Sequence, residues 1–258
     1  MRLAVVLVAA MFAQSASADE KPPNFGAQPK SDWSGAYIGA FGGLGTSSGR
    51  AVLDEHSGNL IPLDVEYGLF PRRIDRSSTG GVAGIGVGYN FQSGSFVHGI
   101  EADIGYVGTS SHQSYSRIDN VPSSPFPGVS TNTSYSTDFG ILATLRARGG
   151  YAFGDTLVFG SIGLAAGHVR NRFELSLPEI GYTSPDWSGS GTRLGYAIGI
   201  GLEHRVTSNV SLKFEALYVN LANRIVRGTD PTAFAGEMIS YRFANDLLIS
   251  RLGVNVKF

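Results

Sequence analysis

The stretch "ISRLGVNVKF" at residues 249–258 alternates between two kinds of side chain up to an aromatic final residue. Its apolar members stand at every second position: Leu252, Val254, Val256 and Phe258. Because successive side chains of a β-strand point to opposite faces, this pattern predicts a strand with one apolar face. The ends of a chain fray unless they are tied down. We therefore expect this last strand to pair with another strand of the chain.

The same period of two recurs along the chain in paired segments. The pairs are 81–91 with 96–108, 139–153 with 156–169, and 193–206 with 210–222, and single strands are expected at 33–45 and 247–258. Turns of two to four residues within the pairs alternate with long polar segments at 46–80, 109–138, 170–192 and 223–246. Short turns at one end and long loops at the other are typical of outer-membrane barrels. The sequence predicts an all-β, eight-stranded, antiparallel, up-and-down transmembrane β-barrel with four long extracellular loops.

The composition excludes several classes of function. Only 16% of the residues are charged, against about 25% in an average soluble domain, and the net charge is −1. A chain without a basic excess offers no field for nucleic acid. The absence of cysteine excludes disulfides, thiolate metal sites and a cysteine nucleophile.

The first residues read as a targeting segment. Arg2 precedes the apolar run "LAVVLVAAMFA" (3–13), and "ASA" (16–18) fits a signal-peptidase site. The run is shorter than the roughly 20 apolar residues of a transmembrane helix. We expect a signal peptide over 1–18, a periplasmic leader over 19–32 and one barrel domain over 33–258.

The polar face of the strands is expected to line the lumen. A soluble, lipocalin-like barrel would also alternate, but the charged face here is rich in glycine, which suits a narrow interior better than a water-facing surface. The expected inward charges are Glu101, Asp103, Arg146, Arg148, Glu203, Arg205, Lys213, Glu215 and Arg251. Neighbouring strands would bring Glu101 and Asp103 to Arg146 and Arg148, and Glu203 or Glu215 to Arg205 or Lys213. Such charges form either a salt-bridge plug or the selective lining of a narrow pore.

Three motifs carry a resemblance to a known family. "WSGAYIG" (33–39), "GGVAGIGVGYNF" (80–91) and the terminal "LGVNVKF" (252–258) resemble eight-stranded outer-membrane barrel proteins of alphaproteobacteria, in particular porin-like and haem-binding surface antigens. The resemblance implies residence in the bacterial outer membrane and favours a non-enzymatic role. No cofactor is expected. It also implies that Phe258 is the C-terminal aromatic read by the barrel-assembly machinery.

Histidines are the candidates for a haem or metal site. His56, His112 and His168 are expected in or beside the long loops, where imidazole nitrogens could ligate haem iron. No pair of histidines has the close spacing of a metal motif, so solvated loop histidines are the simpler interpretation. A lipid-active enzyme built on His204 is disfavoured because alternation places its neighbour Glu203 on the opposite face.

The long segments are expected to face the cell exterior. Their arginines could bind phosphates of lipopolysaccharide and other outer-membrane lipids: Arg72, Arg73, Arg76, Arg170 and Arg172. Their aromatic residues, among them Phe70, Phe126, Phe173 and Trp187, would either hold an extracellular ligand or host surface or pack on one another. The sequence thus indicates a structural and surface-interacting protein, with a small-solute pore or a haem and ligand receptor as alternatives.

Overall fold

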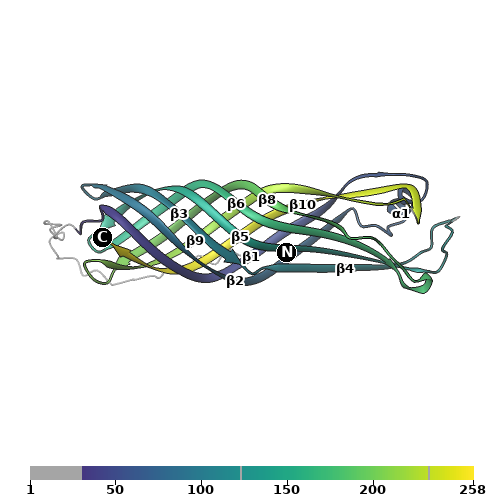
Figure 1. The fold of residues 1–258 in the computed structure, drawn as a ribbon, viewed down its shortest axis with the longest axis horizontal. Coiled ribbons are helices and arrows are strands. Elements are labelled where there is room, and N and C mark those ends of the chain that lie inside the picture. The colour runs from purple at the N-terminus through teal and green to yellow at the C-terminus, as the bar shows by residue number, and fades with distance from the viewer. Residues whose placement is uncertain (1–30, 123, 232) are drawn as a thin grey trace, which may run out of the picture.

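A computed structural model describes residues 31–122, 124–231 and 233–258 (Figure 1). The expected signal peptide and residues 19–30 of the expected leader lie outside this part of the chain. The elements are β1 (Gly35–Ser57), α1 (Ile61–Glu66), β2 (Arg73–Ser93), β3 (Phe96–Val107), β4 (Ser110–Ile118), β5 (Ser130–Phe153), β6 (Thr156–Leu177), η1 (Pro178–Ile180), β7 (Tyr182–Thr183), β8 (Trp187–Arg205), β9 (Val210–Asp230) and β10 (Phe234–Lys257). Among the described residues, no helix is long and apolar enough to cross a membrane.

The long strands close into one antiparallel ring of eight. β3 and β4 follow each other along the same side of β5 and count as one position, so the ring runs β1–β2–β3/β4–β5–β6–β8–β9–β10 and returns to β1. In the closing pair Tyr37 stands opposite Lys257. The backbone N–H of Phe258 also donates to the carbonyl of Ala36 at 3.0 Å. The predicted eight-stranded antiparallel barrel, and the pairing of its last strand with its first, are confirmed.

The three short turns lie together at one end of the barrel, near the C-terminus (Figure 1). Gly94 and Gly154 in two of these turns have φ of 65° and 60°. Glycine adopts this left-handed region without the penalty that a Cβ imposes, which explains why the hairpins reverse at these points.

The strands continue well beyond the segments that the sequence predicted. The prediction of long loops is wrong for most of 46–80, 109–138, 170–192 and 223–246, since β1 continues to Ser57, β5 already begins at Ser130 and β9 continues to Asp230. The connections that remain span 58–72, 119–129, 178–186 and 231–233. Strands that face water need polar outer residues, and this polarity made them look like loops.

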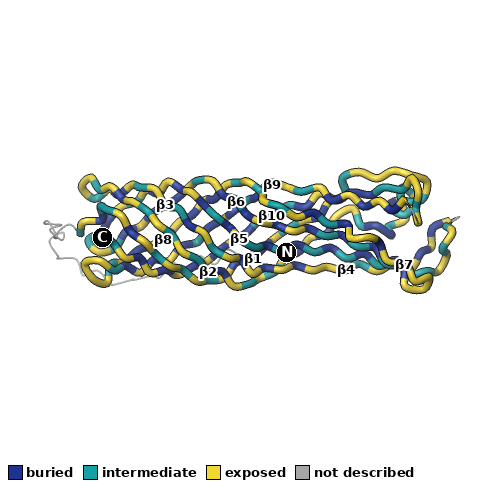
Figure 2. Tube along the Cα trace, viewed as in Figure 1, coloured by how far each residue is buried: buried dark blue, intermediate teal, exposed yellow. Residues whose placement is uncertain are grey.

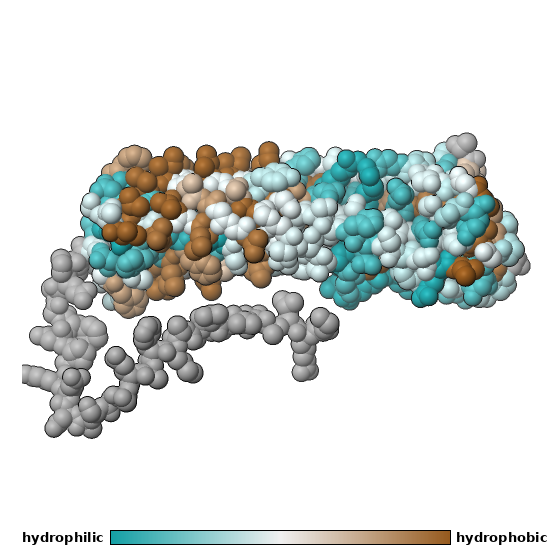
Figure 3. Space-filling view, turned by 90° about the horizontal axis from the view of Figure 1, so that it is seen from below, coloured by the Kyte–Doolittle hydropathy of each residue, from teal (hydrophilic) through white to brown (hydrophobic). Residues whose placement is uncertain are grey.

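Exposed apolar side chains form a belt around the half of the barrel that carries the short turns (Figure 3). On β3 the belt runs from Phe96 to Tyr106, which are 57% and 61% exposed. A stretch of this length matches the roughly 9–11 residues that a tilted strand needs to cross a bilayer. Exposed aromatic residues flank it on both sides, with Phe91, Tyr151, Phe153 and Phe258 toward the short turns and Tyr106, Tyr196 and Tyr218 toward the other end. We call this part the belt half and the remainder, which carries α1, β4, η1 and β7, the distal half.

Buried positions recur along the strands from the short turns to the distal end (Figure 2), and their side chains form successive interior layers. The inward positions of β10 pass through four of them in order: Asn255 and Arg251, then Ile249 and Leu247, then Asn245, then Phe243, Tyr241 and Ile239. A charged layer is thus followed by an apolar cluster, a polar layer and a second apolar cluster. Every one of these β10 side chains is at most 4% exposed.

Candidate functional site

Eight charged side chains lie in the lumen of the belt half, and we call them the lumen network. They project inward from five strands and comprise four acids and four bases, none more than 8% exposed: Glu101, Asp103, Glu203, Glu215, Arg146, Arg148, Lys213 and Arg251. Their formal charges cancel, so the layer as a whole is neutral. The alternation of the strands places them here, since each lies on the face opposite to the apolar belt.

Arg146 of β5 is the centre of the lumen network. Its Nη2 lies 2.6 Å from Glu101 Oε1 and 2.8 Å from Asp103 Oδ2, while its Nη1 pairs with Glu215. Arg251 joins the same acids, with its Nη2 2.7 Å from Glu215 Oε2 and 2.9 Å from Asp103 Oδ2. Buried ions survive when they are paired and hydrogen-bonded, and the two guanidinium groups meet that condition here.

Other pairs cross the lumen instead of joining neighbouring strands. Glu203 and Lys213 stand opposite each other on β8 and β9, which is one of the pairings that the sequence suggested. Glu203 Oε2 instead lies 2.8 Å from Arg148 Nη2, and Lys213 Nζ lies 2.8 Å from Glu101 Oε2. The narrow lumen explains both pairs, because long side chains reach past the neighbouring strand: Arg148 on β5 reaches Glu203 two strands away on β8, and Lys213 reaches Glu101 on the opposite wall.

Uncharged residues complete the lumen network. The Tyr37 hydroxyl donates to Glu101 Oε2 at 2.7 Å and accepts from Arg148 Nη1 at 2.9 Å. Asn255 Nδ2 donates to Glu203 Oε1 at 2.7 Å. These two roles were not predicted from the sequence, although both residues lie on the inward face of their strands.

Arg205 and Phe258 lie at the short-turn end. Arg205 is half-buried, donates to the backbone carbonyl of Asp32 and places its guanidinium 4.8 Å from the ring centre of Trp33. It forms no ion pair with the lumen network within the described residues. Phe258 is 78% exposed beside β1.

The three candidate histidines stand on different strands. His56 is near the end of β1, His112 is on β4 and His168 is on β6, and all three are exposed. His112 Nε2 lies 3.0 Å from Ser114 Oγ. Across the described residues, no group of three or more potential ligands is arranged to hold a metal ion. The structure does not bring these histidines together.

The arginines of the expected loops differ in their exposure and in their partners. Arg170 and Arg172 face outward and pair with Asp186 at 3.2 and 3.0 Å. Arg76 is turned inward and is 5% exposed, which corrects its expected place on the surface. Its Nη1 donates to Thr137 Oγ1 at 2.5 Å, its guanidinium lies 4.7 Å from the ring centre of Phe243, and it has no acidic partner among the described residues.

The aromatic residues of the expected loops pack on one another. Phe173 stacks on Trp187 with ring centres 5.3 Å apart, and Phe70 meets Phe173 edge to face at 6.5 Å. These three side chains belong to the apolar cluster of the distal half. Of the two interpretations of these aromatic residues, the structure supports mutual packing.

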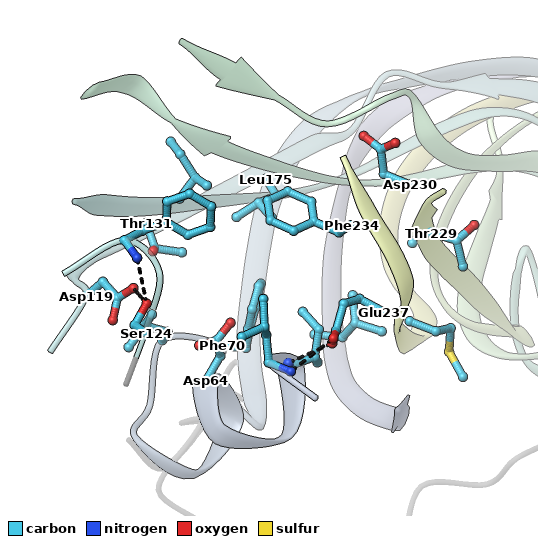
Figure 4. A pocket seen from close by; sticks show the side chains of 18 of the residues that line it. Asp64, Phe70, Asp119, Ser124, Thr131, Leu175, Thr229, Asp230, Phe234 and Glu237 are labelled. Atoms are coloured by element: carbon cyan, nitrogen blue, oxygen red, sulfur yellow. Dashed lines mark hydrogen bonds between the residues drawn. The ribbon is translucent and has the colours of Figure 1, made fainter. Parts of the chain in front are cut away.

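A pocket opens at the distal end, between α1, the 119–129 connection and the ends of β6, β9 and β10 (Figure 4). Its volume is about 50 Å³. Phe70, Leu175 and Trp187 supply apolar walls, and the carboxylates at its edges come from Asp64, Asp119, Asp230 and Glu237. The walls of this pocket come from segments far apart in the chain, so it could not be predicted from the sequence.

Three of the four pocket acids have structural partners. Glu237 accepts the backbone N–H groups of residues 59, 60 and 61 at 2.7, 3.0 and 2.9 Å and so holds the start of α1. Asp119 accepts from Val121 N at 3.0 Å and from Ser124 Oγ. Asp230 accepts from the Tyr182 hydroxyl at 2.9 Å.

Asp64 on α1 differs from the other three acids. Its carboxyl group forms no hydrogen bond or ion pair with the described residues. Burial, followed by the negative charges of Asp119 and Glu237, raises its pKa to about 7. A carboxylate in this position lacks a cation.

Comparisons with known proteins agree with the fold. The model of a family described as outer membrane protein beta-barrel domain matches residues 4–243. The chain is 28% identical to a 22 kDa outer membrane protein of Rhizobium leguminosarum over 90% of this chain and 81% of that protein. It is also 28% identical to a 31 kDa outer-membrane immunogenic protein of Brucella melitensis, over 97% of both chains.

Solved structures give a looser likeness. The outer membrane protein OprG of Pseudomonas aeruginosa aligns with 87% of this chain and 97% of its own, at 12% identity and a TM-score of 0.44. A likeness at this level carries no inference about activity. The sequence relatives confirm the predicted resemblance to outer-membrane antigens of alphaproteobacteria.

Proposed function

Because the chain belongs to the outer membrane protein β-barrel family and resides in the bacterial outer membrane, we propose that it is a structural, non-enzymatic protein with a closed lumen. In this proposal the belt half sits in lipid and the distal half meets the cell exterior. The observation that carries it is the uninterrupted stack of interior layers, from the lumen network to the distal apolar cluster.

Two successive barriers support a closed lumen. An ion would first have to part four acids and four bases that neutralise one another at 2.6–2.9 Å in most pairs. It would then meet an apolar cluster that includes Leu217, Val219 and Leu247, each 0% exposed. Apolar constrictions block ions because they exclude the water that would hydrate them.

A narrow pore is the second candidate, and the charged lining is the feature that favours it. Single-channel recording of the refolded mature protein in a planar bilayer separates the two. We expect a silent bilayer from protein that is folded by its heat-dependent shift in gel mobility, with a general porin as the conducting control. A steady, reproducible conductance would contradict the closed lumen and would make the lumen network a selectivity filter.

The surface role rests on the distal half. A relative that is named an immunogenic outer-membrane protein supports exposure of this part on the cell. Proposed partners are lipopolysaccharide and outer-membrane lipids around the belt, an extracellular ligand or host surface at the distal end, and the assembly machinery at Phe258. A haem site at His56, His112 and His168 receives no support from their positions on three strands.

Protease treatment of intact cells tests the orientation. With the distal half outside, cleavage is expected within the connections 58–72 or 119–129 and not in the short turns at 94–95 and 154–155. Cleavage of the short turns in intact cells, with the distal connections untouched, would reverse the proposed orientation.

A further inference from the structure

The distal pocket combines an apolar interior with charge of a single sign. Its walls include Phe70, Leu175, Trp187 and Ile239, and no lysine, arginine or histidine is among its described lining residues. Four carboxylates stand at its edges, and Figure 4 shows Asp64, Asp119 and Glu237 on the side of the pocket formed by α1 and its neighbouring connection. An occupant that complements this surface has an apolar body and a positive charge.

The acids are not placed to share a metal ion. The described residues contain no group of three or more carboxylates or imidazoles that could ligate one ion. Three of the four pocket acids are already engaged with backbone or hydroxyl donors. Among the pocket acids that the structure describes, Asp64 is the one whose carboxyl has no hydrogen bond or ion pair with a described residue, and it stands at the edge of an apolar cavity. This is a site for one ion pair and not for a coordination sphere.

We propose that the distal pocket binds a small organic cation, in which an ammonium group faces Asp64 and an aromatic or short aliphatic body lies against Phe70, Leu175 and Trp187. The volume of about 50 Å³ limits the part that enters to a few non-hydrogen atoms, with the remainder at the mouth. The inference goes beyond the proposed structural role and is independent of it, since a conducting or a silent lumen leaves this pocket unchanged.

Physical chemistry supports this occupant. Burial of the carboxyl and its two acidic neighbours disfavour the charged form of Asp64 and raise its pKa to about 7. A bound ammonium group would pair with the carboxylate of Asp64, and it would also offset the repulsion of that carboxylate by Asp119 and Glu237. A neutral molecule of the same shape gains only the apolar contact.

Trp187 provides a reporter inside the pocket. The chain has two tryptophans, and Trp33 lies at the opposite end, so the Trp33→Phe variant carries a single reporter in the pocket. We would titrate this protein in non-ionic detergent with 2-phenylethylamine, 2-phenylethanol and phenylacetate at about pH 8. We expect saturable fluorescence changes with the amine, weaker binding of the alcohol and none of the carboxylate.

Two variants assign the preference to Asp64. In Asp64→Asn the affinity for the amine is expected to fall about tenfold, to that of the alcohol, because one close charge pair is lost. Glu66→Gln is the matched control, since it removes the same charge from an exposed position of the same helix and should leave the amine affinity unchanged. Retained alcohol binding in Asp64→Asn shows that the pocket is still formed.

Several outcomes would overturn the proposal. Equal affinity for amine and alcohol in the parent protein would mean that the pocket does not select charge. An equal fall in Glu66→Gln would mean that the amine responds to the general negative field of the distal end. If Asp64→Asn loses its fold, Asp119→Asn serves instead, with a smaller loss of amine affinity expected and an unchanged affinity contradicting the ammonium site.

Discussion

The belt half and the distal half share the same eight strands but differ in the polarity of their outer faces and in the charge of their interior layers. In the belt half, apolar side chains such as Ile162 and Leu252 face outward, 60% and 67% exposed, while Arg146 and Glu215 lie inside. In the distal half Phe173 and Tyr241 lie inside, and polar residues cover the outside (Figure 3). The strand period of two is unchanged, so the difference teaches that solvent, and not the backbone, decides which face is apolar.

The two halves also treat a buried arginine differently. Arg146 in the belt half has three acidic partners within the lumen network. Arg76 in the distal half is 5% exposed and has a threonine hydroxyl and an aromatic ring as its partners. The charges of the belt half are therefore mutually dependent, whereas Arg76 lies in a polar layer with Thr137 and has no acidic partner among the described residues.

The largest expected effect comes from removing these two charges in matched variants. Arg146→Met should cost about 3–5 kcal/mol, because it leaves buried acids without their partner. Arg76→Met should change stability by no more than about 1 kcal/mol, since it loses one hydrogen bond and removes an unpaired ion. Urea unfolding followed by tryptophan fluorescence and gel mobility measures both. Equal costs would mean that the two interiors are alike.

An apolar-to-lysine substitution on the outer face sharpens the comparison of the two surfaces. Ile162→Lys lies within the belt and should cost about 2–4 kcal/mol in a lipid bilayer, because it places a charge near the membrane centre. Ile118→Lys at the end of β4 is the control, 65% exposed beyond the belt, and should be nearly neutral. Folding into phosphatidylcholine vesicles across a denaturant series reports both values. If Ile162→Lys does not change the free energy of folding, this part of the belt does not lie in lipid.

Two tyrosine hydroxyls compare hydrogen bonding in the two interiors. Tyr37 bonds to the charged groups of Glu101 and Arg148, whereas Tyr241 donates to the backbone carbonyl of Pro71 at 2.9 Å. Bonds to charged groups contribute about 1.5–3 kcal/mol and neutral ones about 0.5–1.5 kcal/mol. Tyr37→Phe is therefore expected to be the more destabilising of the two in the same urea assay. The reverse order would show that the lumen network does not depend on the Tyr37 hydroxyl.

The strands of the belt half could be predicted from the sequence because a lipid-facing strand alternates clearly between apolar and polar residues. Alternation such as that of 210–220 separates Lys213 and Glu215 from the apolar positions, and the structure buries both charges. The partners of these charges were out of reach, since Lys213 meets Glu101 across the lumen. The curvature of the barrel and the stagger of its strands determine which acids a basic side chain can reach. The local alternation of residues determines neither.

The distal half was misjudged for a physical reason. Residues 169–177 alternate between inward Val169, Phe173 and Leu175 and outward charged residues, which is a strand pattern for a surface in water. The prediction treated charged outer faces as loops and so missed the strand. Arg76 was placed on the surface by the same assumption, and the distal pocket could not be predicted because α1 and Glu237 meet only in the folded chain.

The smallest expected effect concerns the protonation of Asp64. Its pKa is about 7 in the folded protein against 3.8 for the free side chain. Between these values the folded protein binds a proton that the unfolded chain has released, so the stability of the distal end falls as pH rises from about 4 to about 7 and is constant above that range. Asp64→Asn should remove this loss. At pH 8 the amide hydrogens of residues 58–72 should exchange more slowly in the Asp64→Asn variant than in the parent protein.

The difference between Asp64→Asn and the parent protein should largely disappear at about pH 5. At that pH Asp64 is protonated, so the parent protein already has a neutral group at this position. Glu66→Gln, exposed on the same helix, should match the parent protein at both pH values. If exchange is slower in Asp64→Asn than in the parent protein by the same factor at pH 5 and pH 8, the effect comes from packing of the amide. That result would contradict an uncompensated charge at Asp64 in the distal pocket.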